Sequence, residues 1–210
     1  MYLLYYSPGT ASMAVHHALI ELGVQHELRA VDLDSQQQRS PGYLELHPNG
    51  TVPTLVVDGA PVYECGALLL LLAERHADAG LAPAPGSPAR ACWLQWMVHL
   101  ANTLQPAFRQ WFYPQDFAPR EHEQESKEFA RRRIEAAWRR LDAHLAKAGP
   151  HVAGDAFSMA DIYATMLMRW SRNMPRPATT WPALADVAAR VKSRPSWQRL
   201  YEIEGLTEWA

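Results

Sequence analysis

Three hydroxyl side chains surround a tight turn near the start of the sequence. The apolar and aromatic run 2–6 is followed by Ser7, a Pro-Gly pair, Thr10 and Ser12. The run predicts a buried strand that the turn ends, and Ser12 is placed to cap a following helix. Hydroxyl groups donate hydrogen bonds, and the first turn of a helix favours negative charge. The turn is therefore a candidate site for holding an anion, with a plain capping role for Ser12 as the alternative.

A second position that favours an anion lies at Glu64 and Cys65, which open a leucine-rich segment of helical spacing. Backbone amides and the helix dipole favour negative charge at such a position. The alternative for Glu64 is a carboxylate that only stabilises the dipole. The Cys65 thiol is a weaker hydrogen-bond donor than a hydroxyl. The sequence has no GxSxG elbow, no phosphate-binding glycine loop and no HExxH helix, so hydrolase, nucleotide and zinc-protease chemistry find no support.

Strands and helices alternate in the first half of the chain and must position these residues. The Asp58-Gly59 pair between two β-rich runs predicts a hairpin. A proline-rich break at 81–88 separates this half from the rest. In chain order we expect a strand at 2–6, a helix at 12–23, a strand at 26–31, a short helix at 41–46, a hairpin of 52–57 with 61–63, and a helix at 64–77.

The second half has helical spacing throughout. Ser158 and Asp161 form a predicted capping box, and two last helices are expected at 181–191 and 195–203, giving about five helices in all. We expect domains at 1–78 and 88–210, joined by a linker at 79–87. Two sets of apolar residues at helical spacing indicate these helices. One face is Trp93, Met97, Leu100 and Leu104, and the other is Ile134, Trp138, Leu141 and Leu145.

Composition limits the possible functions. The 210 residues are 48% apolar, and 20 basic against 22 acidic side chains give a net charge of −2, which predicts a soluble globular protein without an electrostatic surface for nucleic acid. The longest apolar run, 67–73, is too short to span a membrane. Two cysteines, Cys65 and Cys92, are too few for a disulfide framework or a four-ligand zinc site. A reducing compartment, the cytoplasm, is expected.

Three motifs follow one another along the chain, namely Tyr5-Tyr6-Ser7-Pro8-Gly9-Thr10-Ala11-Ser12, Asn49-Gly50-Thr51-Val52-Pro53-Thr54-Leu55 and Tyr63-Glu64-Cys65. Together with the order of the expected elements, they resemble the glutathione transferases over nearly the whole chain. The resemblance is strongest to the bacterial beta class, whose first turn reads Pro-Gly-Ala-Cys-Ser. It implies an α/β plus all-α fold class, with an N-terminal thioredoxin-like βαβ-ββα domain, a C-terminal helical bundle and a homodimer.

The resemblance implies that glutathione binds along the first domain. In the family, the residue before a cis-proline pairs its backbone with the central cysteine of the tripeptide, and this position falls on Val52 with Pro53. Glu64 and Cys65 match the helix start that receives the γ-glutamyl carboxylate, where most relatives carry serine in place of Cys65. We expect Gln37, from the 36–39 stretch, to meet the glycine carboxylate, with a solvated loop as the alternative.

The implied chemistry is ionisation of the glutathione thiol, which at a pKa of about 8.5 is mostly protonated at neutral pH. Lowering that pKa by about two takes about 2.7 kcal/mol, and one hydrogen bond to a charged group supplies roughly 1.5 to 3 kcal/mol. The beta-class cysteine aligns with Ala11, so mixed-disulfide chemistry is not expected. In the serine-type classes the activating hydroxyl follows the Pro-Gly, which assigns the catalytic role to Thr10 first and Ser12 second.

The resemblance also implies a pocket for an apolar electrophile between the domains. We expect a glutathione transferase of the alkyl or aryl transfer type, acting in detoxification with glutathione as co-substrate and no metal. Two alternatives remain, a scaffold that binds glutathione, an apolar ligand or a protein without turnover, and a glutathione-dependent isomerase or reductase. The predicted pocket residues are Asn102, Phe108, Trp111, Tyr113 and Trp170.

Overall fold

The computed structural model describes the whole chain, residues 1–210, which groups into two compact units. The first unit comprises Met1–Gly80 and Lys192–Ala210, and the second comprises Leu81–Val191. This grouping differs from the predicted bounds (1–78, 79–87 and 88–210) in one main respect, since the end of the chain groups with the first unit. The reason is that the last helix packs against the first one, as described below.

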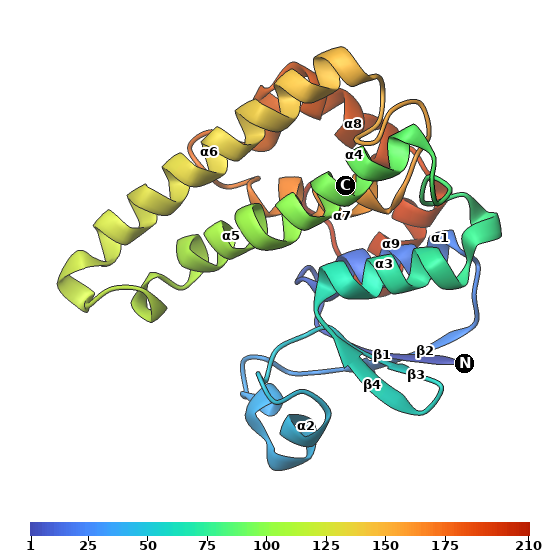
Figure 1. Cartoon of the computed structure of the whole chain (residues 1–210). Coiled ribbons are helices and arrows are strands. Elements are labelled where there is room, and N and C mark those ends of the chain that lie inside the picture. The colour runs from blue at the N-terminus through green and yellow to red at the C-terminus, as the bar shows by residue number, and fades with distance from the viewer. The chain divides into compact units, whose positions relative to one another are not determined.

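A four-stranded mixed sheet forms the centre of the first unit, with the strand order β2-β1-β3-β4 (Figure 1). β1 pairs parallel with β2 and antiparallel with β3, and β3 pairs antiparallel with β4. Asp58 and Gly59 have φ of 53° and 85°, the left-handed conformations that a two-residue hairpin turn requires. The predicted hairpin and the thioredoxin-like βαβ-ββα order are therefore confirmed. The strands are β1 (Tyr2–Tyr6), β2 (His26–Ala30), β3 (Thr54–Val57) and β4 (Ala60–Tyr63).

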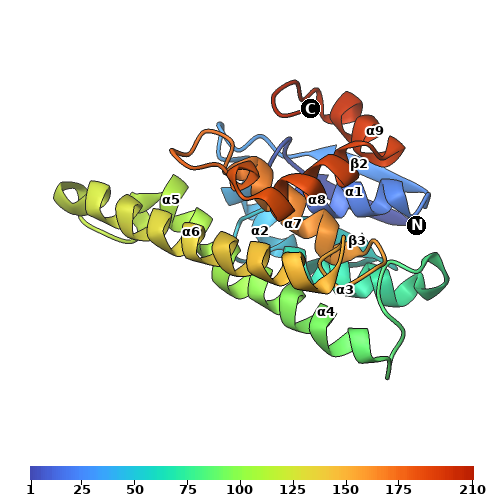
Figure 2. The same ribbon diagram turned by 90° about the horizontal axis from the view of Figure 1, so that it is seen from above.

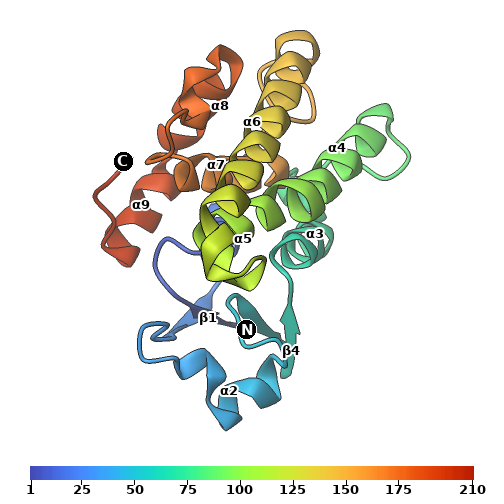
Figure 3. The ribbon, with the colours of Figure 1, turned by 90° about the vertical axis from the view of Figure 1, so that its left-hand side faces the viewer.

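Helices cover both faces of this sheet. α1 (Ser12–Glu21) and α3 (Cys65–Arg75) lie on one face, and the short α2 (Pro41–Leu46) lies on the other (Figures 1 and 3). Side chains alternate along β1, so the fully buried Leu4 and the nearly buried Tyr5 serve opposite faces. On the α2 side, Tyr5 packs with Val31, Tyr43 and Val52. The predicted short helix at 41–46 thus supplies part of a second core.

The last helix, α9 (Pro195–Glu204), lies beside α1 (Figure 2). Arg194 at the start of α9 pairs with Glu21 at the end of α1, and the Ser196 hydroxyl donates to the same carboxylate. Because that hydroxyl donates to Glu21, the His17 Nε2–H must donate to Ser196 Oγ, 3.0 Å away. The His17 ring also meets Trp197 edge-on, with 5.6 Å between centroids. Polar and aromatic contacts therefore hold the chain end on α1.

The second unit is helical throughout, as predicted. With α9, which groups with the first unit, the chain beyond residue 81 forms six α-helices, where about five were expected. A π-helical turn, Leu100–Leu104, divides an apolar pattern that is continuous in sequence. Pro106 lies in the following turn and has no N–H for the usual helical bond, which favours such a turn. The helices of this unit are α4 (Pro88–His99), α5 (Gln105–Phe112), α6 (Glu123–Ala148), α7 (Met159–Trp170) and α8 (Pro182–Lys192).

The core of the second unit contains both predicted apolar faces. Trp93 and Trp138 have no exposed surface, and the other members of the two faces are buried with them. The predicted capping box at the start of α7 is confirmed, because Asp161 accepts from the backbone N–H of Ser158 at 2.9 Å while the Ser158 hydroxyl faces the first helical amides. No helix of the chain combines the length and apolar character that a membrane span needs.

The buried His17 makes the stability of the first unit dependent on pH. Burial lowers the pKa of His17 from 6.5 to about 3; the carboxylate of Glu21 opposes this shift, and the charges of Arg194 and His16 add to it. The folded state therefore holds a neutral imidazole, while the unfolded chain takes up a proton below about pH 6.5. Stability is full above that pH and is lost as the pH falls toward 3.

We predict that His17→Gln, which keeps a donor for Ser196, removes this dependence. Between pH 7.5 and 5.0 the wild-type protein should lose about 2 kcal/mol of unfolding free energy through His17, and the variant should not. Urea unfolding at both pH values measures the difference. The matched control is His122→Gln, because His122 is exposed, and it should behave as wild type. An equal loss in His17→Gln and wild type contradicts the prediction.

Candidate functional site

The strand register brings three turns to one edge of the sheet. Tyr5 of β1 lies opposite Thr54 of β3, and Thr54 lies opposite Tyr63 of β4. The end of β1, the start of β3 and the end of β4 are therefore neighbours, so the turns attached to them meet. These turns carry Thr10, the Val52-Pro53 pair and the Glu64-Cys65 pair. The structure thus brings together five predicted site residues, or six with Ser12, at one place.

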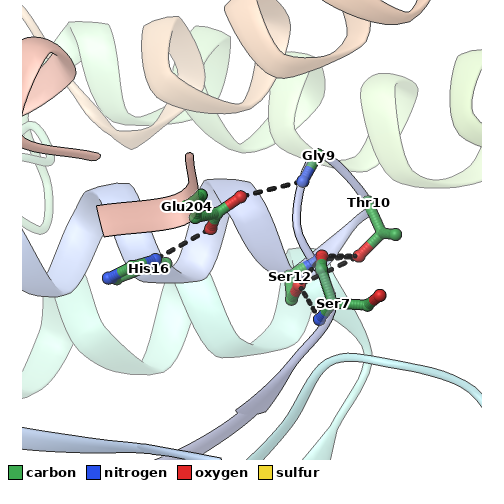
Figure 4. Close-up of polar contacts among 6 residues, drawn as sticks. All are labelled: Ser7, Gly9, Thr10, Ser12, His16 and Glu204. Atoms are coloured by element: carbon green, nitrogen blue, oxygen red, sulfur yellow. Dashed lines mark hydrogen bonds and ion pairs between the residues drawn. The ribbon is translucent and has the colours of Figure 1, made fainter. Parts of the chain in front are cut away.

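In the turn after β1, the hydroxyls of Thr10 and Ser12 lie 2.9 Å apart (Figure 4). Both also approach the carbonyl oxygen of Ser7, Thr10 Oγ1 at 2.7 Å and Ser12 Oγ at 3.0 Å. The backbone N–H of Ser7 donates to Ser12 Oγ at 3.1 Å. The alternative prediction, that Ser12 caps the helix, is therefore wrong. It is the first residue of α1, Ala11 is the N-cap, and no side chain caps this helix.

The two hydroxyls differ in what they can reach. Ser12 has no exposed surface, whereas Thr10 is partly exposed. If the Thr10 hydroxyl turns to an anion, Ser12 can donate either to Thr10 Oγ1 or to the Ser7 carbonyl, which keeps its hydrogen bond. The Thr10 hydroxyl can therefore donate a hydrogen bond to a ligand without leaving a buried group unpaired. Thr10 can act as the donor and Ser12 can support it.

A carboxylate from the far end of the chain holds the same turn. Glu204 Oε2 accepts from the Gly9 N–H at 2.8 Å, and Oε1 lies 2.8 Å from His16 Nδ1 (Figure 4). The side chains of His16 and Glu204 have no exposed surface. Sequence reasoning missed Glu204, because 195 residues separate it from Gly9 and no local signal marks the pair.

The turn before β3 is fixed at both ends. The Val52–Pro53 peptide bond is cis, as expected, and both residues are buried. The Tyr43 hydroxyl donates to the Thr51 carbonyl at 2.7 Å, and Arg39 donates to the Asn49 carbonyl at 3.0 Å. Burial raises the pKa of Tyr43, so this phenol stays protonated and keeps donating. The backbone at Val52 is therefore presented in one conformation.

At the third turn, Glu64 and Cys65 open α3 as predicted. Glu64 has φ 78° and ψ 109°, a conformation that non-glycine residues adopt at a cost and that is concentrated at functional sites. The Cys65 thiol is buried and donates to the Ala11 carbonyl at 3.4 Å. Cys65 therefore ties the start of α3 to the start of α1. The first amides of α3 are oriented to receive an anion.

Gln37 takes a different place from the other predicted glutathione residues. Its amide oxygen accepts from the Asp32 N–H at 2.8 Å, which closes the loop after β2. Gln37 also lines a hollow of about 220 Å³ between β2 and α2, together with Tyr5, Arg29 and Ser40. None of Thr10, Val52 or Glu64 lines this hollow.

The predicted electrophile residues all lie in the second unit, where they do not form a single group. Phe108 is fully buried. Its ring centroid lies 5.7 Å from that of Trp170, which it meets edge-on, and 6.1 Å from that of Phe112, which is stacked on it. Trp111 instead lies under Lys127, whose Nζ is 5.2 Å from the ring centroid. Tyr113 carries the Arg109 guanidinium 4.0 Å above its ring, and Asn102 accepts from the Thr103 hydroxyl. The structure thus joins Phe108 and Trp170 but gives Trp111, Tyr113 and Asn102 other partners.

Comparisons with known proteins agree with this fold. Residues 10–75 match the N-terminal domain of glutathione S-transferases, and residues 102–199 match the C-terminal domain. Glutathione S-transferase GST-4.5 of Xanthomonas campestris pv. campestris is 31% identical over 97% of this chain and 98% of its own. The chain therefore belongs to the glutathione S-transferase family.

Solved structures show the same likeness. A sphingomonad glutathione S-transferase complexed with glutathione has a TM-score of 0.84 and 33% identity, covering 98% of this chain and all 100% of its own. The bacterial beta class enzyme of Sphingomonas chungbukensis has a TM-score of 0.83 and 30% identity, with 98% and 100% coverage. The predicted resemblance to the family, and to its beta class, is confirmed. No group of three or more His, Cys, Asp or Glu side chains is placed to hold a metal ion.

Gly50 supplies a sharp test of the turn before β3. It has φ +57°, and a Cβ there would lie 2.7 Å from the Gln38 carbonyl oxygen and 2.9 Å from an Arg39 guanidinium nitrogen. Gly23 has a similar φ, +64°, but open space around it. We predict that Gly50→Ala lowers the unfolding free energy by about 1 to 3 kcal/mol more than Gly23→Ala, because only Gly50 adds a clash to the backbone strain. Urea unfolding of both variants measures this, and equal losses contradict it.

Proposed function

We propose that this chain is a glutathione S-transferase that ionises the thiol of glutathione with the Thr10 hydroxyl and directs it at an apolar electrophile. The observation that carries the proposal is the hydroxyl pair at the start of α1, with 2.9 Å between Thr10 Oγ1 and Ser12 Oγ. A thiolate is an anion, and this turn combines a partly exposed donor with the first turn of a helix. Both features favour the charged form of a thiol.

Ser12 supports Thr10 in this proposal. When Thr10 donates to the thiolate, the buried Ser12 hydroxyl takes over as donor, and its oxygen still accepts from the Ser7 N–H. One hydrogen bond to a charged group is worth roughly 1.5 to 3 kcal/mol, against about 2.7 kcal/mol for lowering a thiol pKa by two. A single hydroxyl with the helix start behind it is therefore sufficient.

The rest of the tripeptide is assigned to the other two turns. The backbone of Val52, beside cis-Pro53, pairs with the central residue of glutathione as an added strand would. The amides at Glu64 and Cys65 receive the γ-glutamyl carboxylate. Gln37 remains the candidate for the glycine carboxylate, although its amide oxygen already accepts from Asp32.

We assign the apolar electrophile to aromatic side chains of the second unit. Phe112 and Tyr113 are 46% and 42% exposed, so two neighbouring aromatic rings of this unit are accessible to a ligand. Phe108 and Trp170 support Phe112 from behind. Trp111 and Asn102 stay predicted pocket residues. A flat apolar substrate fits such a surface better than a charged one, which agrees with a role in detoxification.

A homodimer and a cytoplasmic location belong to the same proposal. Leu94 and Val98 lie four residues apart on α4 and are 39% and 51% exposed, so one apolar stripe of this helix is open to a second copy. Cys65 and Cys92 are both free thiols, as expected in a reducing compartment.

Calorimetric titration of glutathione at neutral pH, in two buffers of different ionisation heat, tests the function. We predict that the wild-type protein releases nearly one proton on binding and that Thr10→Ala releases much less. The value of kcat/KM with a chlorodinitrobenzene electrophile should fall about 10- to 100-fold in Thr10→Ala, since one charge-assisted hydrogen bond is lost. Thr10→Ser is the matched control and should keep both. Wild-type binding without proton release contradicts a transferase and favours a ligand-binding protein.

Cys65 gives a second prediction for the same site. Cys65→Ser replaces a thiol that donates to the Ala11 carbonyl with a hydroxyl that is a stronger donor and can turn from that carbonyl to the γ-glutamyl carboxylate. We expect the dissociation constant of glutathione to fall about fivefold, which corresponds to about 1 kcal/mol. The control is Cys92→Ser, because Cys92 belongs to the second unit, and it should bind as wild type. Unchanged or weaker binding by Cys65→Ser contradicts the assignment.

A further inference from the structure

His47 lies in the loop before β3 and has only 2% of its surface exposed. The backbone N–H of Asn49 donates to His47 Nδ1 at 3.3 Å, so this nitrogen carries no proton. The other ring nitrogen, Nε2, then carries the proton of the neutral imidazole and donates to Thr51 Oγ1 at 2.9 Å. One neutral tautomer of His47 thus holds both ends of the turn Asn49–Thr51.

The His47 ring also joins this turn to the end of β4. It stacks on Tyr63, with 4.1 Å between ring centroids and 13° between planes. Tyr63 immediately precedes Glu64, and Thr51 immediately precedes Val52. A single side chain in the loop before β3 therefore connects the Asn49–Thr51 turn with the end of β4, which leads into the turn at Glu64.

Protonation of His47 would break this arrangement. A protonated ring carries hydrogen on both nitrogens. Nδ1 would then be a donor facing the Asn49 N–H, which is also a donor, and their hydrogen bond would be lost. Three charged or titratable groups surround the loop, namely the Glu64 carboxylate, the Tyr63 phenol and the Arg39 guanidinium that holds the Asn49 carbonyl. Burial lowers the pKa of His47, and the carboxylate of Glu64 only partly opposes this shift.

We propose that neutral His47 is a positioning residue for glutathione, and that its protonation releases the Asn49–Thr51 turn and weakens glutathione binding. This inference rests on the proposed function. It adds a residue that does not touch the tripeptide but sets the backbone at Val52 and the approach to Glu64. Affinity for glutathione should therefore fall once the pH drops below the pKa of His47, which burial holds below its usual value of about 6.5, and the loss should require His47.

S-methylglutathione is a suitable probe, because it has no thiol to titrate. We expect its dissociation constant for the wild-type protein to rise as the pH falls from 7.0 to 5.0, by up to about tenfold per pH unit below the pKa of His47. His47→Asn keeps an acceptor for the Asn49 N–H but cannot titrate. Its dissociation constant should be about 5- to 10-fold above wild type at pH 7.0, where one hydrogen bond and one ring stack are lost.

The decisive quantity is the ratio of the two dissociation constants, in which any titration of the ligand cancels. It should shrink toward one as the pH falls to 5.0. A ratio that stays constant overturns the inference. No binding by the wild-type protein at pH 7.0 overturns the proposed function, and this inference with it. His122→Asn, with an exposed histidine in the second unit, should follow wild type at every pH.

Kinetics and spectroscopy complete the test. His47→Asn should raise KM for glutathione and leave kcat at saturating glutathione within about twofold, because His47 acts before the chemical step. An equal loss in kcat contradicts a positioning role. Should His47→Asn fail to fold, the titration of the His47 ring in the wild-type protein decides by nuclear magnetic resonance. Bound S-methylglutathione should move its midpoint to lower pH, and an unmoved midpoint overturns the inference.

Discussion

The site depends on the hydrogen bond between the buried carboxylate of Glu204 and the backbone N–H of Gly9. This carboxylate accepts from the Gly9 N–H at 2.8 Å and lies 2.8 Å from His16 Nδ1, and the side chains of His16 and Glu204 have no exposed surface. A buried carboxylate that loses its partners destabilises a fold by several kcal/mol. α9 must therefore close on α1, and the turn after β1 must take the one shape that offers Gly9 to Glu204. That shape also sets Thr10 beside Ser12.

The turn before β3 follows the same principle, since side chains that do not belong to its Val52-Pro53 pair fix its backbone. Tyr43 and Arg39 hold the carbonyls of Thr51 and Asn49, and His47 holds the intervening turn. Strand pairing then determines where the turns meet, because Thr54 has a partner on each side in the sheet. Glutathione would bind to backbone whose conformation is already set, which reduces the ordering entropy that binding must overcome.

Local chemistry made much of this predictable from the sequence. The Asp-Gly hairpin, the capping box of Ser158 with Asp161, and the helix start at Glu64 are short-range patterns, and the structure has all three. The misses depend on contacts that form only in the folded chain, or on a local signal that is easily overlooked. A capping role is a natural interpretation of Ser12 from sequence, because the backbone groups of Ser7 come within reach of its hydroxyl only when the turn is folded. Nothing near Gly9 points to Glu204. The π-helical turn interrupts a continuous apolar pattern, and Pro106 just after it is the local feature that favours it.

The position of Cys65 narrows the chemistry that the site can perform. Ala11, which stands where the beta-class cysteine aligns, contributes only its carbonyl, and that carbonyl accepts from the Cys65 thiol. A buried thiol engaged in this way points toward the start of α1 and is not presented as a nucleophile. Covalent exchange with glutathione therefore lacks a protein thiolate, whereas hydroxyl stabilisation of the glutathione thiolate needs none. Ala11 in place of the cysteine, together with Thr10 where the beta class has alanine, therefore fits the proposed direct transfer from glutathione to an electrophile better than disulfide chemistry.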